Sequence, residues 1–190
     1  MQLFWLAMKA GLVIALLLVV ILVVKTRLEY RRRTYDPTVI LVFQKQFDEM
    51  DEDNIRKDAA NVCGRYLELP DTDDEKYRWL KIEDDDRDKL EPVLDFFEDL
   101  GFYLAGDQFS DEVTHHHFFP WIRGYYSILK PYIDYYRDKE NEKATYVFIE
   151  QLYERVCEIE KTFPTVKLLL DTKIEKLEFL RDERQSGNAE

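Results

Sequence analysis

The sequence predicts an all-α protein with a single N-terminal transmembrane helix followed by a cytoplasmic helical bundle. An apolar run from Leu3 to Val24 is interrupted only by Lys9. Beyond it, apolar residues recur at the three- and four-residue spacings of helices, and no alternating strand pattern of useful length occurs. The 12 Tyr and 12 Phe supply bulky core material, while 6 Gly and 6 Pro are few for a loop-rich chain. These features favour a helical bundle.

The apolar run is long enough to cross a membrane as a helix. About 20 residues at about 1.5 Å each span a hydrocarbon core of about 30 Å, where a helix satisfies its own backbone. A secretory signal peptide is the alternative, but no small-x-small cleavage pair follows Val24, and a basic flank comes instead. This flank predicts an N-terminus outside and a cytoplasmic C-terminal domain at the cell inner (plasma) membrane. Membrane lipid is the expected partner of residues 3–24, with Trp5, Lys9, Lys25, Arg27, Arg31, Arg32 and Arg33 at the membrane interface.

Charge separates the two ends of the chain. Residues 1–33 hold six Lys or Arg and one acid, a net charge of +5. Since the whole chain carries −12, residues 34–190 carry −17. Such an acidic domain is repelled by phosphate backbones, which argues against nucleic acid as a direct ligand. We therefore expect a transmembrane anchor and basic flank at 1–33, an acidic helical domain at 34–184 and a flexible tail at 185–190.

Two helices are predicted at the start of the domain. The first begins at about Pro37, a residue type suited to the first helical position, with Asp36 as its N-cap. The second runs from about Asp53 to Leu69 and ends before Pro70. Their apolar faces are Val39, Phe43, Phe47 and Met50 in the first helix, and Ile55, Ala59, Val62 and Tyr66 in the second.

A less regular segment and a long helix follow. Residues 71–86 are acidic and poorly periodic, so we expect a loop or short helix attached to the core through Trp79 and Leu80. The helix from about Lys89 to Ala105 should carry Pro92 in its first turn and end at Gly106-Asp107. Its stripe is the clearest in the chain: Leu90, Val93, Leu94, Phe97, Leu100 and Leu104.

The last three helices should complete the bundle. Ser110 is the expected N-cap of the next one, which is rich in aromatic residues and which Pro120 and Pro131 should kink or divide. Two amphipathic helices are then predicted at about 142–161 and 164–184. Their stripes are Tyr146, Ile149, Leu152, Val156 and Ile159, and Val166, Leu170, Ile174 and Leu177.

Part of the domain resembles a widespread family of bacterial membrane-anchored helical proteins that carry a domain of unknown function. The resemblance lies in a Phe-Phe-Glu-x-hydrophobic-Gly helix, a Ser/Asp-x-x-Val turn, an aromatic helix reaching Leu-x-Pro-x-Ile, and a final Phe-x-x-x-Leu. It implies the anchored helical architecture and a bacterial source, and it brings no established activity. The matching stretches are Leu94 to Gly101, Asp107 to Val113, Trp121 to Tyr126, Leu129 to Ile133, Tyr136-Arg137 and Phe148 to Leu152.

Only one group of residues suggests metal chemistry. Glu112 lies on the same helical face as His115 and His116, and a Glu-x-x-His pair from each of two helices is what di-iron bundles use. All three histidines of the chain lie at 115–117, so a second such pair is absent from one subunit. A histidine cluster near a helix start is the favoured interpretation, with Glu112 and His115 as the alternative metal candidates.

Other site motifs are absent from the sequence. The acidic runs at 71–75 and 83–86 lack the Gly and Glu that an EF-hand loop needs at its sixth and twelfth positions. No Gly-rich phosphate loop, Gly-x-Ser-x-Gly elbow or His-Glu-x-x-His occurs. Cys63 and Cys157 have no metal or redox spacing and are interpreted as buried thiols. We expect no cofactor and name no catalytic residue.

Two functional hypotheses remain. The favoured one is a non-enzymatic protein-interaction or scaffold module at the cytoplasmic face, which binds a protein partner or its own copies through an aromatic groove or a helix face. Tethering to a membrane raises effective concentration, so weak surfaces suffice for such binding. The alternative is a metal-dependent enzyme or sensor that uses Glu112 and His115 with acids from neighbouring helices.

Overall fold

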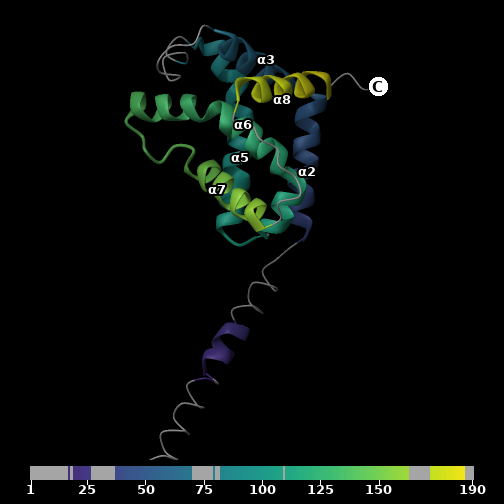
Figure 1. The fold of residues 1–190 in the computed structure, drawn as a ribbon, viewed down its shortest axis with the longest axis vertical. Helices are drawn as coiled ribbons and strands as arrows, with labels where there is room; N and C mark the ends of the chain where they lie inside the picture. The colour runs from purple at the N-terminus through teal and green to yellow at the C-terminus, as the bar shows by residue number, and fades with distance from the viewer. Residues whose placement is uncertain are drawn as a thin grey trace, which may run out of the picture. The chain divides into compact units, whose positions relative to one another are not determined.

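The computed structural model describes residues 17, 19–26, 37–69, 79, 82–108, 110–162 and 172–186 (Figure 1). These residues contain helices and no strand, so the all-α prediction is confirmed for the described part of the chain. Contacts divide the chain into two units, Met1–Asp36 and Pro37–Glu190. The helices of the second unit are α2 (Pro37–Glu52), α3 (Ile55–Glu68), α5 (Asp84–Ala105), α6 (Asp111–Glu140), α7 (Val147–Thr162) and α8 (Lys173–Ser186).

In the first unit, the described residues form part of a helix. Residues 17 and 19–26 are helical, and the apolar side chains of Leu17 and residues 19–24 are between 52% and 67% exposed. The rest of the predicted span, residues 3–16 and 18, lies outside the described residues, as do Arg27 and residues 31–33. Among the helices that are described, none is both long and apolar enough to cross a membrane.

The first two helices of the domain begin and end close to where the sequence predicts. α2 starts at Pro37, as expected, while its expected N-cap Asp36 lies outside the described residues. α3 starts two residues after Asp53, because Asn54 adopts a left-handed conformation with φ 60° between the two helices. Asn accepts this conformation more readily than most residues. Phe43, Phe47 and Met50 of the predicted α2 face are buried, but Ile40 is buried where Val39 was predicted, and Val39 is half-buried. In α3 the predicted residues Ala59, Val62 and Tyr66 are buried, whereas Ile55 is half-buried.

Trp79 attaches the segment between α3 and α5 to the core, as the sequence predicts. It is only 2% exposed, and its ring stacks on that of Tyr66 with 4.7 Å between centroids. Most of the segment, including Leu80, lies outside the described residues.

α5 begins earlier than predicted, and its first turn includes the end of the acidic segment for which the sequence predicts a loop or a short helix. Asp84, Asp85 and Asp86 form its first turn, where carboxylates interact favourably with the positive end of the helix dipole. Asp86 is buried and accepts a hydrogen bond from Arg65 of α3. Because of this earlier start, Pro92 lies in the third turn and not in the first. All six residues of the predicted apolar stripe are buried.

α6 is one unbroken helix of 30 residues, so the expected division at Pro120 or Pro131 is wrong. Its start is as predicted, since the Ser110 side chain accepts a hydrogen bond from the N–H of Val113 at 3.3 Å. A proline removes one backbone hydrogen bond, and here burial of the surrounding residues offsets that loss. The buried residues of α6 include Phe118, Phe119, Ile122, Tyr125, Tyr126, Ile128, Leu129, Tyr132 and Ile133, so its aromatic segment contributes much of the core.

α7 begins at Val147, five residues later than predicted, because Arg137 holds the preceding residues in a turn. The guanidinium donates to the backbone oxygens of Thr145 at 2.7 Å and Tyr146 at 2.9 Å. It also pairs with Glu150 in the first turn of α7 at 3.0 Å. Of the predicted stripe, Ile149, Leu152 and Val156 are buried.

α8 buries a different face from the one that its apolar residues predict. The expected stripe residue Ile174 is 69% exposed, whereas Leu180 and Glu183 are buried at 0% and 4% exposure. α8 packs mainly against α3, and Figure 1 shows it in yellow beside that helix. The expected stripe residues Val166 and Leu170 lie outside the described residues. The sequence therefore predicted a helix here correctly but assigned its buried face wrongly.

Candidate functional site

A groove of about 360 Å³ lies between α2, the start of α3 and α5. Met50 and Phe96 are buried beneath it and give it an apolar floor. Carboxylates and other exposed or half-exposed groups form its rim. Its lining residues are Gln46, Glu49, Met50, Asp53, Ile55, Pro92, Asp95, Phe96 and Asp99.

The two walls of the groove follow the same residue spacing. Along α2 the lining residues lie at 46, 49 and 50, with Asp53 directly after the end of that helix, and along α5 they lie at 92, 95, 96 and 99. Residues three, four and seven apart share one face of a helix. Each wall therefore carries an apolar residue, Met50 or Phe96, between two acids in the chain: Glu49 and Asp53 on one wall, and Asp95 and Asp99 on the other. The groove is thus apolar at its base and negative at its edges.

Electrostatics within the groove favour a bound cation. Burial raises the pKa of Asp95, the neighbouring Asp99 raises it further, and a hydrogen bond from Tyr146 opposes both effects. Glu49 pairs with Lys45 at 3.0 Å on the exposed side of α2, where such pairs contribute little. A partly desolvated carboxylate beside a like charge is stabilised by any cation that approaches it. The arrangement can therefore hold a cationic group and includes no nucleophile poised beside a base.

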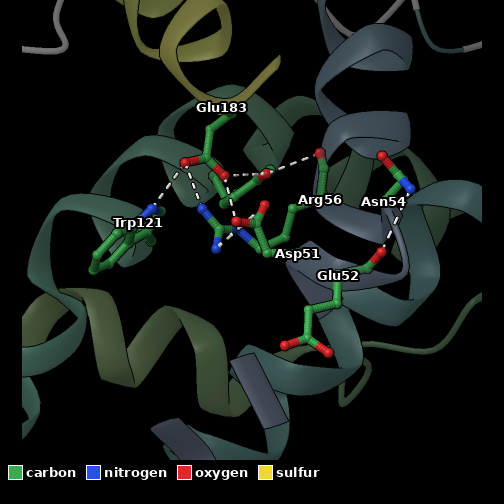
Figure 2. A network of polar contacts seen from close by, with 7 residues as sticks. Asp51, Glu52, Asn54, Arg56, Trp121 and Glu183 are labelled. Atoms are coloured by element: carbon green, nitrogen blue, oxygen red, sulfur yellow. Dashed lines mark hydrogen bonds and ion pairs between the residues drawn. The ribbon is translucent and has the colours of Figure 1, made fainter. Parts of the chain in front are cut away.

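A second polar centre is buried where α3, α6 and α8 meet (Figure 2). The Arg56 guanidinium donates from Nε to Glu183 Oε2 at 3.0 Å and from Nη2 to Oε1 at 2.8 Å. The indole N–H of Trp121 donates to Oε1 at 2.9 Å, and the Tyr125 hydroxyl donates to Oε2 at 2.9 Å. Arg56 and Glu183 are 5% and 4% exposed. Four donor groups thus converge on one carboxylate.

The surroundings of this centre fix the position of the ion pair and favour the charged form of Arg56. Burial by itself would lower the pKa of Arg56, but the hydrogen bond and negative charge of Glu183 outweigh it and leave that pKa raised. The carbon of the guanidinium lies 4.1 Å from the centroid of Phe47, and its Nη1 is 3.9 Å from Asp51 Oδ1. Burial and the Glu183 charge raise the pKa of Tyr125 well above its usual value. The centre is a fixed ion pair that joins helices.

The structure places the two metal candidates apart from any multi-ligand cluster. Glu112 is exposed in the first turn of α6, and His115 is half-buried with its ring stacked on Phe119 at 4.4 Å. Burial lowers the pKa of His115, and the charge of Glu160 opposes that shift. Within the described residues, no group of three or more His, Cys, Asp or Glu is arranged to hold a metal ion.

The other residues that the sequence indicated are the expected membrane-interface residues and the two cysteines. Lys25 is helical and exposed, whereas the other expected membrane-interface residues lie outside the described part of the chain. Cys63 is buried, and burial raises the pKa of its thiol to about 12. Cys157 is half-buried and, like Cys63, is not in a disulfide.

The sequence alone identified neither the acidic α2–α5 groove nor the buried Arg56–Glu183 centre. Arg56 and Glu183 are 127 positions apart and belong to no motif, so nothing in the sequence pairs them. The acidic groove did leave a signal, because the order acid, apolar residue, then acid three positions later occurs at 49–53 and again at 95–99. That repeat becomes meaningful only when α2 and α5 are known to be neighbours.

Comparison with known proteins gives one match. The model of a family described as a domain of unknown function, DUF4760, matches residues 5–156. No curated protein matches the chain, and no solved structure matches it. The matched residues include α2, α3, α5, α6 and most of α7, and they end before α8.

Proposed function

The chain belongs to the DUF4760 family of domains of unknown function, and we propose that it is a membrane-anchored, non-enzymatic module that binds a cationic protein segment in its α2–α5 groove. The observation that carries this proposal is the pairing of an apolar floor, Met50 and Phe96, with acids on both walls.

The chemistry of the groove defines the partner. Lys and Arg side chains have apolar stems and charged ends, so a stem can lie on the Met50 and Phe96 floor while its charge meets the rim. A volume of about 360 Å³ suits one or two such side chains and is too small for a whole helix. The net charge of −17 over residues 34–190 attracts cationic partners and repels nucleic acid. The proposed partner is therefore a protein segment that presents Lys or Arg beside an apolar residue.

A single-pass anchor at residues 3–24, with the domain on the cytoplasmic face of the inner (plasma) membrane, completes the proposal. It is supported by the apolar sequence of those residues and by the basic flank that follows them. The described part of this segment also has its apolar side chains more than half exposed in the isolated chain. Large exposed apolar surfaces of this kind are covered by another apolar phase. An anchored domain meets other membrane proteins at high effective concentration, so a small groove suffices.

The test is photocrosslinking of the full chain in native membranes. A photoreactive residue replaces exposed Gln46 at the groove, and in a matched control it replaces exposed Glu154 on α7. Crosslinked peptides are identified by mass spectrometry. We expect capture from position 46 of segments that carry Lys or Arg beside apolar residues, and we expect the double substitution Asp95→Asn and Asp99→Asn to reduce that capture about tenfold.

Three results would count against the proposal. They are the same captured peptides from position 154, captured segments without Lys or Arg, or a yield that Asp95→Asn and Asp99→Asn leave unchanged. A further control replaces Glu68 and Glu154, which are exposed on α3 and α7, by Gln. This pair removes the same amount of charge away from the groove, so a loss of capture in both double variants would indicate general charge attraction.

A further inference from the structure

The contacts of α8 differ from those of the other helices. α8 lies beyond the residues that match the family, and residues 163–171, which are nine of the ten residues between α7 and α8, are outside the described part of the chain. Leu180 is its one fully buried apolar side chain among the described residues, while Ile174 is 69% exposed. The position of α8 therefore depends on the polar contacts of Glu183 and Arg184 as well as on apolar packing.

The surface under α8 is shaped to receive particular side chains. Gly64 of α3 faces the Arg184 guanidinium and Gly124 of α6 faces the Phe179 ring, so closely that a Cβ at either glycine would overlap its neighbour. Arg184 Nη2 donates to the backbone oxygen of Ala60 at 3.2 Å. The α3 and α6 surface therefore has two hollows, one for an arginine and one for an aromatic ring.

The same surface also holds a carboxylate. Arg56, Trp121 and Tyr125 all belong to the α3 and α6 side, and all donate to Glu183, as Figure 2 shows for the labelled Arg56, Trp121 and Glu183. Arg56 is oriented by Phe47, and the Tyr125 hydroxyl lies 3.2 Å from the backbone oxygen of Arg56. If Glu183 left, a buried guanidinium would lose its main counter-charge, which is costly. The surface therefore demands an acidic side chain at this position.

We propose that the α3–α6 surface is a recognition site for a helix of the pattern Phe-Leu-x-x-Glu-Arg, and that residues 179–184 of α8 fill it as an exchangeable ligand. The pattern names the four side chains that the site contacts: Phe179, Leu180, Glu183 and Arg184. This site is separate from the α2–α5 groove and does not depend on it.

The test uses the full chain in detergent, with a protease recognition sequence placed within residues 163–171. After cleavage, a fluorescent peptide of residues 173–186 is added and its binding is followed by fluorescence anisotropy. We expect the labelled peptide to replace α8 and to bind saturably. The Glu183→Gln peptide should bind about 100-fold more weakly, because it leaves Arg56 without a full counter-charge. The matched Glu178→Gln peptide changes an exposed acid of the same helix and should bind like the wild type.

Circular dichroism of the cleaved protein shows whether α8 is an exchangeable ligand or a structural part of the core. Retained helical signal in the rest of the chain after α8 leaves supports the proposal, and general loss of that signal overturns it, because α8 would then be part of the core. Failure of the labelled peptide to replace α8 also overturns it, as does equal binding of the Glu183→Gln and Glu178→Gln peptides. A change in crosslinking from position 46, by contrast, would bear on the α2–α5 groove and would leave the proposal about α8 unaffected.

Discussion

The carboxylate of Glu98 in α5 accepts the backbone N–H of Ile149 in the first turn of α7 at 2.8 Å. One helix therefore supplies the N-terminal cap of another, because α7 begins in a turn whose own residues leave that N–H without a partner. One turn further along α5, Gly101 lets the backbone of Phe148 approach so closely that a Cβ would overlap its carbonyl. These two contacts explain the Glu and the Gly of the Phe-Phe-Glu-x-hydrophobic-Gly segment in structural terms.

Replacing Glu98 by Ala should lower the free energy of unfolding by about 1–2 kcal/mol, since it removes a helix cap. Glu98→Gln should cost less, because the amide oxygen can still accept from Ile149. Thermal unfolding of the full chain in detergent, followed by circular dichroism, measures both. The control Glu154→Ala removes an exposed acid from α7, the helix that Glu98 caps, and should stay within about 0.5 kcal/mol of wild type. Equal losses in Glu98→Ala and Glu154→Ala would disprove the capping role.

Gly101 and Gly64 both lie at helix contacts, but their replacement by Ala should affect stability differently. Gly101→Ala places a methyl group against the Phe148 backbone, which cannot move aside, so we expect a loss of about 2–3 kcal/mol. Gly64→Ala meets the far end of the flexible Arg184 side chain, and the better helix propensity of Ala, up to about 1 kcal/mol, offsets much of that clash. Parallel unfolding curves of the two variants compare them, and a Gly64→Ala variant that proved the less stable would contradict this account.

The Arg56–Glu183 pair should be strongly coupled. Arg56→Met leaves a buried carboxylate and Glu183→Leu leaves a buried guanidinium, so each should cost about 3–5 kcal/mol. The double variant should lose less than the sum of the two single losses by about 2 kcal/mol, because neither charge is then left alone. A double-mutant cycle from unfolding measurements gives this coupling energy. Additive losses would mean that the two side chains contribute independently.

Asp95→Asn should stabilise the domain slightly at neutral pH and have no such effect in acid. The pKa of Asp95 is raised in the folded chain, mainly by burial, so the folded state disfavours the charged form. The difference from wild type should be complete above the folded pKa and should vanish below the ordinary pKa of 3.8. Melting temperatures at pH 7 and pH 3 test this, with exposed Asp88→Asn as the control. A larger stabilisation by Asp95→Asn at pH 3 than at pH 7 would contradict this expectation.

The proposed anchor predicts that the full chain resists alkaline carbonate extraction from membranes. Val13→Asp together with Leu16→Asp should release it into the soluble fraction, since these residues lie near the middle of the span at residues 3–24 and each charge in the bilayer centre costs about 3 kcal/mol. Leu41→Asp changes a residue of α2 that is 58% exposed, and that variant should remain in the membrane. A protease outside intact cells should leave residues 34–190 undigested. Digestion of that part would contradict the cytoplasmic placement.

Most helices of the domain could be located from the sequence because their signals are local. The buried stripe of α5, from Leu90 to Leu104, repeats with the helical period and is buried in full. Pro37 and Ser110 begin their helices as their residue types predict. The start of α5 was missed because Asp86 resembles a solvated loop residue until Arg65, from another helix, pairs with it.

The sequence by itself determined the all-α class, the order of the helices, the apolar face of α5 and most of that of α2, since periodicity depends on residues close in the chain. Only the tertiary structure decided that α8 turns Glu183 inward while Ile174 stays exposed. It also decided that the acids of α2 and α5 share one groove. The physical reason is the same in both cases: the environment of a charged side chain depends on which distant helix lies against it, and helical periodicity carries no record of that neighbour.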